Sequence, residues 1–223
     1  MNNSNVHSVQ RAESGILESN SVLRNTYLLL SMTLLFSALT AAISMVFALP
    51  HPGLLLTLAG YFGLLFATAK YRDSSLGLVL VFALTGFMGY TLGPILNAYL
   101  ALANGSQIVA TAMVGTGAIF IGLSAYARTQ RRDFSKMGGF LAVGILVAFL
   151  AGLGAIFFNM PTLSLVVSAM FILLMSGLIL YETDQILRNG ETNYIMATVT
   201  LFVSIFNLFT SLLHLLGFIS GEE

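Results

Sequence analysis

The chain has 223 residues, of which 57% are hydrophobic and 8% are charged, and its nine basic side chains balance its nine acidic ones. A typical globular protein has about 25% charged residues, so we expect the apolar excess to face lipid. The composition excludes a nucleic-acid-binding protein, which needs a concentrated basic face, and a disordered chain, which needs charge in place of Leu and Phe. Because the chain has no cysteine, disulfides and Cys-ligated metal sites are also excluded.

Seven apolar segments are long enough to be transmembrane helices, since about 20 helical residues cross the hydrocarbon core of a bilayer. The sequence therefore predicts an all-α, polytopic membrane protein. Pro50 and Pro52 separate the first two segments, and this short junction is where the count is most open to error. Asn159 and Pro161 end the fifth segment. The expected spans are residues 26–49, 53–69, 76–102, 108–127, 137–158, 163–181 and 194–219.

The basic residues fall on alternate connections between these spans. Lys and Arg stay on the cytoplasmic side of a membrane, so the pattern predicts a cytoplasmic N-terminus and an external C-terminus. We expect a flexible cytoplasmic tail at 1–25, a transmembrane domain at 26–219 and a short external tail at 220–223. The first apolar stretch, of about 24 residues, exceeds the 7–15 of a signal peptide and indicates an uncleaved anchor. The basic residues are Arg11, Arg24, Lys70, Arg72, Arg128, Arg131, Arg132, Lys136 and Arg188.

Small residues recur at a spacing of four in three of the spans, which is typical of helices whose backbones approach closely. We expect them to pack helices of one chain together, with dimerisation as the alternative. Pro94, which follows Gly93, is expected to kink the third span and free a backbone carbonyl, either shaping a cavity or bending the helix around its neighbours. The small residues are Gly89 and Gly93, then Gly144, Ala148 and Gly152, then Ser164 and Ser168.

Two acidic residues stand at the cytoplasmic end of the sixth span, and ionisable groups at membrane depth are functional candidates. Glu182 and Asp184 are two residues apart, about 200° around a helix, so they do not form a carboxylate pair on one face. For Asp184 we expect a solvated helix end. For Glu182 a solvated helix end and an ion site are both open.

The seventh span has a polar stripe with a spacing of 4, 3, 4 and 3 residues, which places its members on one face. That face must meet protein or water. It either supplies hydrogen bonds between helices or forms one wall of a hydrophilic path whose inner mouth lies near Glu182. His214, near the outer end, is more simply a hydrogen-bonded core residue than a switch. The stripe consists of Thr200, Ser204, Asn207, Ser211 and His214.

Catalytic motifs are missing from the sequence. HExxH, GxSxG and the P-loop do not occur, and no span supplies a nucleophile or metal together with a base. The last span has no lysine for a retinal Schiff base. We therefore expect no enzymatic activity, no catalytic residue and no resident cofactor.

Three segments resemble the Bax inhibitor-1 (TMBIM) family, and the resemblance extends over nearly the whole chain. They are the Arg-Asn-Thr-Tyr run at 24–27, the glycine-rich run at 85–97 that contains Gly-Pro-Ile-Leu, and Gly-Glu-Thr-Asn-Tyr at 190–194, which is more specific to one bacterial branch. The resemblance implies a bundle of seven helices in which six surround the seventh. It also implies the bacterial inner membrane.

Two functions follow from this resemblance. In calcium-leak members of the family, two Asp residues share a proton and gate the pore. The matching positions in this sequence are Glu182 and Ser204. Because Ser204 carries no charge, the pair of like charges that would raise a carboxylate pKa is absent. Weak Ca²⁺ or proton binding near Glu182 stays open. The bacterial branch implies binding and restraint of the membrane protease FtsH, for which residues 1–25 would suit as a tail that the protease seizes. We expect a non-enzymatic FtsH modulator, with a pH-sensitive cation leak as the alternative.

Overall fold

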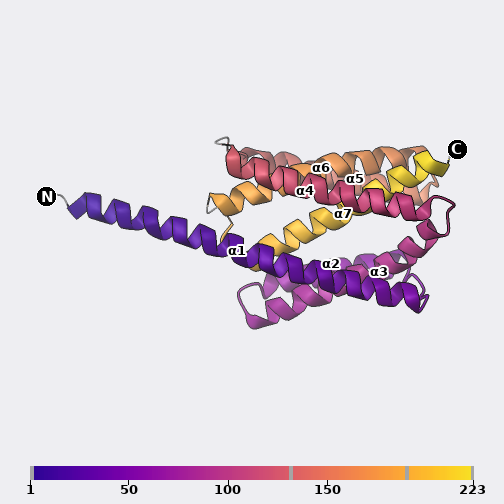
Figure 1. Ribbon diagram of the computed structural model, residues 1–223, viewed down its shortest axis with the longest axis horizontal. Helices are drawn as coiled ribbons and strands as arrows, with labels where there is room; N and C mark the ends of the chain where they lie inside the picture. Colours follow the sequence, from indigo (N-terminus) through magenta and orange to yellow (C-terminus); the bar gives the residue numbers. More distant parts are fainter. Residues whose placement is uncertain (1–2, 131–132, 189–190, 222–223) are drawn as a thin grey trace.

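The computed structural model describes residues 3–130, 133–188 and 191–221, with side chains from Ser21 to Ser220. Within these residues every regular element is helical (Figure 1), which confirms the all-α prediction. The helices are α1 (Asn3–Val46), α2 (Leu54–Lys70), α3 (Ser75–Leu100), α4 (Gly105–Thr129), the 3₁₀ turn η1 (Ser135–Met137), α5 (Gly138–Phe157), α6 (Pro161–Leu187) and α7 (Tyr194–Gly221).

Six helices among the described residues are long and apolar enough to cross a membrane: α1 from Ser21 onward, α3, α4, α5 with its preceding turn, α6 and α7. The chain is therefore a multi-pass membrane protein. The apolar helix α2 has 17 residues, or about 25 Å at 1.5 Å per residue, slightly less than the hydrocarbon thickness. That α2 makes a seventh crossing stays a prediction.

Most helix boundaries follow local chemistry. Asn159 has a positive φ of 49° and Pro161 is the first residue of α6, as expected where one helix ends and a proline starts the next. The predicted end of the sixth span at Tyr181 is too early, because α6 continues to Leu187. Hydropathy marks only the lipid-facing length of a helix, whereas the last turns of α6 are buried against protein.

The helix ends carrying Lys70, Arg128 and Arg188 lie together, and we call this the basic end of the bundle (Figure 1). The segment predicted as a tail is described as helical from Asn3, and it extends past the basic end; its flexibility stays a prediction. Two of the basic residues, Arg131 and Arg132, and the last two residues of the predicted external tail, Glu222 and Glu223, lie outside the described residues.

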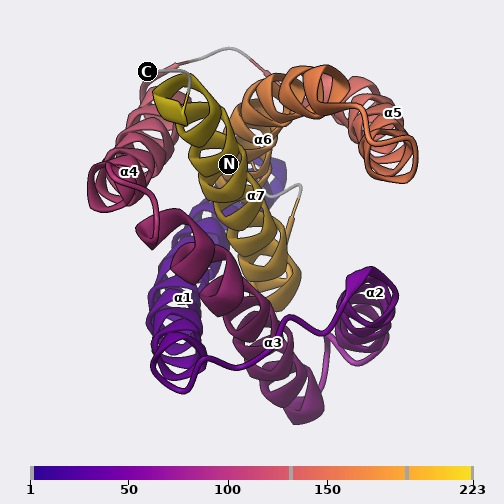
Figure 2. The same ribbon diagram turned by 90° about the vertical axis from the view of Figure 1, so that its right-hand side faces the viewer.

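Helix α7 packs against α1, α3, α4 and α6, and Figure 2 shows it between these helices. Phe202 belongs to a buried cluster with residues of α1 and α3, Leu208 to a second with residues of α5 and α6, and Leu213 to a third with residues of α4. Most of α7 is thus buried or half-buried against its neighbours, while Phe218 and Ile219 near its end are exposed; its central place among six surrounding helices stays a prediction. The helices α2 and α5 lie at the outside, α2 packed on α3 and α5 on α6.

The small residues pack helices within the chain, as expected. A Cβ on Gly89 would collide with the backbone carbonyl of Ser37 in α1, and one on Gly144 would lie 2.7 Å from Leu174 in α6. The glycines therefore permit the close α1–α3 and α5–α6 contacts.

Pro94 lies inside a continuous α3, so the carbonyl of Tyr90, four residues earlier, loses its helical donor. The hydroxyl of Ser44 in α1 donates to that carbonyl at 3.0 Å. The sequence predicted the freed carbonyl; its partner on α1 is visible only in the structure. The kink at Gly93 and Pro94 stays a prediction.

Candidate functional site

The two acidic residues at the end of α6 are both buried, Glu182 with 5% and Asp184 with 1% of its surface exposed. The expectation of a solvated helix end is wrong for Asp184, and of the two alternatives left open for Glu182 its burial contradicts the solvated helix end. As the helical spacing required, they point to different surroundings. Asp184 bonds to the neighbouring connection, whereas Glu182 Oε1 has no hydrogen-bond partner among the described residues.

Asp184 joins the end of α6 to the α4–α5 connection. Its Oδ2 accepts a hydrogen bond from the backbone N–H of Phe134 at 3.0 Å, and its Oδ1 accepts one from Nε of Arg188 at 2.7 Å. The hydrogen bond to Asp184 raises the pKa of the Arg188 guanidinium above its ordinary value. A paired carboxylate with both oxygens occupied is suited to positioning a loop, not to binding an ion.

Four hydroxyl oxygens in the described part of the chain share this feature with Glu182 Oε1. The hydroxyl oxygens of Thr26 and Tyr27 in α1, Ser124 in α4 and Thr183 in α6 are also buried without a hydrogen bond. Buried polar groups nearly always have a partner, and ordered water often supplies it. Ordered water is the ordinary partner of such oxygens in folded proteins.

None of the five stripe residues of α7 is exposed: Ser204 and Ser211 are buried, and the other three are half-buried. That this face forms one wall of a hydrophilic path stays a prediction. Ser204 donates to the carbonyl of Thr200 at 2.7 Å, within its own helix. His214 Nδ1 lies 2.8 Å from Oγ of Ser168 in α6, which makes it a hydrogen-bonded residue between helices. The structure does not join Ser204 to the unpartnered oxygen of Glu182.

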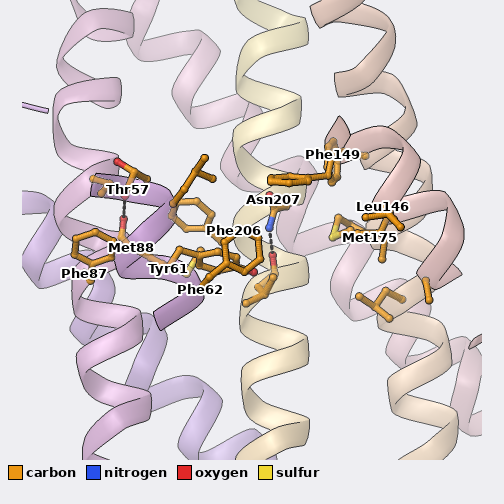
Figure 3. A pocket seen from close by; sticks show the side chains of 17 residues that line it. Thr57, Tyr61, Phe62, Phe87, Met88, Leu146, Phe149, Met175, Phe206 and Asn207 are labelled. Carbon is orange, nitrogen blue, oxygen red and sulfur yellow. Dashed lines mark hydrogen bonds between the residues drawn. The ribbon is translucent and has the colours of Figure 1, made fainter. Parts of the chain in front are cut away.

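Asn207 is the stripe residue that lines a cavity of about 450 Å³ in the middle of the bundle (Figure 3). Aromatic and aliphatic side chains make up most of its wall, so this cavity is not a hydrophilic path. Such an apolar wall offers water few hydrogen-bond partners, and an empty hollow of this size would forfeit dispersion contacts along its lining. We therefore expect the cavity to be filled in the membrane.

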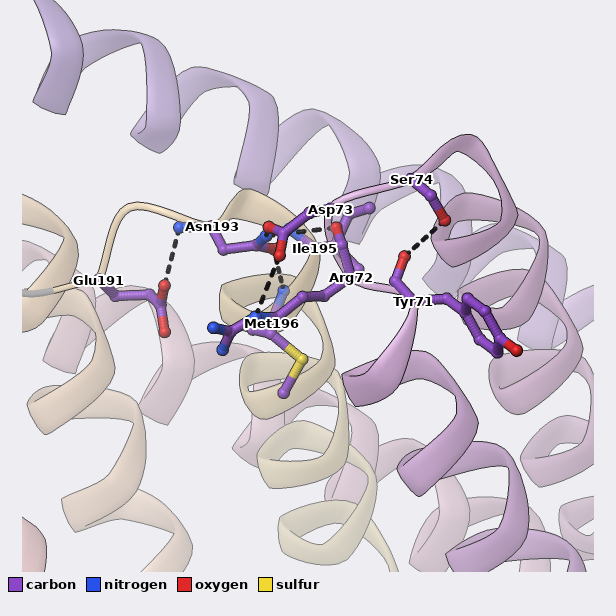
Figure 4. A network of polar contacts seen from close by, with 8 residues as sticks. All are labelled: Tyr71, Arg72, Asp73, Ser74, Glu191, Asn193, Ile195 and Met196. Atoms are coloured by element: carbon purple, nitrogen blue, oxygen red, sulfur yellow. Dashed lines mark hydrogen bonds and ion pairs between the residues drawn. The ribbon is translucent and has the colours of Figure 1, made fainter.

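A polar network at the basic end was not expected from the sequence (Figure 4). Asn193 Oδ1 accepts from the backbone N–H groups of Ile195 and Met196, both at 3.0 Å, and so caps α7. Its Nδ2 donates to Oδ1 of Asp73 at 2.7 Å and to the carbonyl of Arg72 at 3.2 Å. Asn193 thereby ties the start of α7 to the α2–α3 connection. An Asn directly before a long apolar helix is an N-cap signal that could have identified it.

The carboxylate of Glu191 supports this cap, since its Oε1 accepts from the backbone N–H of Asn193 at 2.7 Å. Together Asp184 and Asn193 fix all three connections of the basic end. Within the described residues, no group of three or more His, Asp or Glu side chains is placed to hold a metal ion.

The sequence of the chain matches a known protein family and is similar to several known proteins. Residues 19–221 match the Bax1-I family, described as "Inhibitor of apoptosis-promoting Bax1". The chain is 51% identical to the "Modulator of FtsH protease YccA" of Escherichia coli K12, over 94% of this chain and 95% of that protein. It is 50% identical to an uncharacterised protein of Pseudomonas aeruginosa and 45% identical to an uncharacterised membrane protein of Vibrio cholerae, over 92% and 93% of the chain and 93% of each relative.

Proposed function

The chain belongs to the Bax1-I family, and on this premise we propose that it is a non-enzymatic inner-membrane protein that binds the FtsH protease and modulates its activity. The observation that carries the proposal is the 51% identity, over 94% of the chain, to a protein named as a modulator of FtsH. The likeness covers nearly the full length of both chains, so it includes the connections at the basic end. The relatives' names describe modulators or inhibitors, which agrees with a role without catalysis.

The topology that supports this function has seven crossings, with α7 in the centre and both the N-terminus and the basic end in the cytoplasm. The positive-inside rule supports it, because the basic end holds Lys70, Arg72, Arg128, Lys136 and Arg188. The N-terminal part of α1 extends beyond that end (Figure 1) and would be accessible to a cytoplasmic protease.

The test is co-purification of FtsH with a tagged, full-length chain from cells solubilised in mild detergent. We expect FtsH to co-purify, and deletion of residues 2–20 to slow the turnover of the chain in cells. A variant with residues 2–20 shuffled separates the effect of tail length from that of tail sequence. Absence of FtsH from the purified protein, together with unchanged turnover of the deletion, would contradict the proposal.

A second candidate function is a pH-sensitive cation leak with Glu182 at its mouth. The observation favouring it is the buried, unpartnered Oε1 of Glu182 at the end of α6, where the adjacent hydroxyl of Thr183 also lacks a partner. The test is calcium flux into proteoliposomes at about pH 6 and about pH 8, measured for the wild type and for Glu182→Gln. The control variant is Asp133→Asn, which changes an exposed carboxylate near the same end. Flux that Glu182→Gln abolishes and Asp133→Asn retains supports a leak, and absence of flux at either pH rejects it.

A further inference from the structure

The cavity beside Asn207 lies between two groups of helices. Its wall comes from α2 and α3 on one side, α5 and α6 on the other, and α7 behind (Figure 3). The lining positions fall near the middle of the long helices, for example Met88 in α3 and Met175 in α6. The cavity is therefore at the depth of the lipid hydrocarbon, far from the headgroups.

Besides the phenol of Tyr61, three polar side chains line the wall, and each donates a hydrogen bond to a nearby carbonyl of its own segment. Thr57 donates to the carbonyl of Gly53, Thr91 to that of Met88, and Nδ2 of Asn207 to that of Val203. What these residues present to the cavity is chiefly methyl and ring surface, beside rings such as Phe87 and Phe206 in Figure 3. Such a wall recognises hydrocarbon and offers a phosphate or a cation little.

The cavity opens sideways to the lipid. Leu146 of α5 lines it and is 57% exposed, so at this position the wall is not closed over by protein. The helices α2 and α5 approach each other at the rings of Phe62 and Phe149, whose centroids are 5.7 Å apart, while each packs mainly on its other neighbour. The entrance is thus between two outer helices whose remaining surface is apolar and faces the membrane.

Size decides what fits. A helix with its side chains is about 10–12 Å across, so about 450 Å³ holds roughly 4–6 Å of its length, or one turn. A transmembrane helix of a partner, or a helix of a second copy of this chain, is many turns long and therefore does not fit. A hydrocarbon chain is thin and flexible, and apolar cavities of only about 150 Å³ already take up benzene.

We propose that this cavity binds one acyl chain of a membrane phospholipid, which enters between α2 and α5 and lies against α7. The chain fills the space between the α2–α3 pair and the α5–α6 pair and so holds the two halves of the bundle together. This binding site is separate from the FtsH and cation-leak proposals, and it stands or falls independently of them.

A single tryptophan can report on the site, because the chain has none of its own. Phe171→Trp places the fluorophore in the wall of the cavity. The comparison variant is Leu173→Trp, on the same helix at a position that is 74% exposed to lipid. The full-length protein in mild detergent is titrated with a phospholipid that is brominated in the middle of its chains, since bromine quenches tryptophan on contact.

We expect saturable quenching for Phe171→Trp, with a plateau near one lipid per protein, and a gradual increase without a plateau for Leu173→Trp. Adding Ala142→Phe, which fills the cavity, should move the midpoint to about tenfold more lipid. The same substitution at the exposed Ala118 of α4, which does not line the cavity, should leave the midpoint unchanged.

Unbrominated phospholipid should reverse the quenching of the Phe171→Trp reporter, and glycerophosphocholine, which lacks acyl chains, should not. This competition needs no cavity-filling variant and stays informative if Ala142→Phe fails to fold. Quenching of Phe171→Trp without a plateau, or equal effects of Ala142→Phe and Ala118→Phe, would overturn the proposal. Reporter fluorescence that changes with protein concentration in the absence of lipid would also overturn it, in favour of a second copy as the occupant.

Discussion

Replacing Asp184 by Ala should destabilise the basic end of the bundle, because both carboxylate oxygens accept hydrogen bonds there. Hydrogen bonds involving a charged group contribute about 1.5–3 kcal/mol each. We assign nearly this full contribution to the bond from the Phe134 N–H. The Arg188 side chain is 39% exposed and can bond to water once the carboxylate is removed, so its bond contributes about 1 kcal/mol or less. We expect a loss of about 2–3 kcal/mol, or roughly 5–10 °C in melting temperature for a protein of this size.

Thermal unfolding of the purified protein in detergent, followed by circular dichroism, measures this loss. Asp184→Asn retains an acceptor for the Phe134 N–H and should lose less than half as much. Gln130→Ala, in the same connection but exposed, should change the melting temperature little. If Asp184→Ala melts like the wild type, or if Asp184→Asn and Asp184→Ala are equally destabilised, the carboxylate does not anchor the α4–α5 connection.

Three further predictions concern packing, capping and pH. Gly89→Ala should lower the free energy of unfolding by about 1–3 kcal/mol, because the added methyl group would meet the backbone of α1. The control Gly122→Ala has open space around it and should be neutral or slightly stabilising. Equal melting temperatures of the two variants would contradict the close α1–α3 contact. Asn193→Ala should cost about 1–2 kcal/mol and speed amide hydrogen exchange in the first turn of α7, with Asn193→Asp, which keeps the cap, less affected. Hydrogen bonds from Ser135 hold the pKa of Asp133 below its ordinary 3.8, so its stabilising contribution is complete above that value and is lost as the pH falls through the lower, folded pKa. The melting-temperature difference between wild type and Asp133→Asn, present at about pH 6, should therefore shrink progressively as the pH is lowered below 3.8.

The helices could be predicted from the sequence because a lipid environment leaves few alternatives. A long apolar segment must satisfy its backbone internally and so becomes a helix. The spacing of Gly89 and Gly93 likewise predicted a close helix contact. It did not identify α1 as the partner, because a small residue permits an approach without specifying what approaches.

The burial of Asp184 could not be read in the same way. Hydropathy reports that a carboxylate avoids lipid, but water and a hydrogen-bonding loop both satisfy that condition. Only the position of the α4–α5 connection, with the Phe134 N–H directed at the carboxylate, distinguishes them. The cavity beside Asn207 was missed for a related reason: its wall comes from five helices, and no single segment contains its pattern.

The spacing of Glu182 and Asp184 allows the two proposed functions to be separated by mutation. Asp184 is bonded to the α4–α5 connection at the basic end, which the proposed topology places in the cytoplasm, and Glu182 is buried with an unpartnered oxygen. A variant at Asp184 should therefore loosen this connection while leaving the Glu182 carboxyl in place. A variant at Glu182 should alter the interior while leaving the connection intact. Loss of FtsH binding with Asp184→Ala and loss of cation flux with Glu182→Gln would then be independent results, and a change in both with either variant would mean that the last two turns of α6 act as one unit.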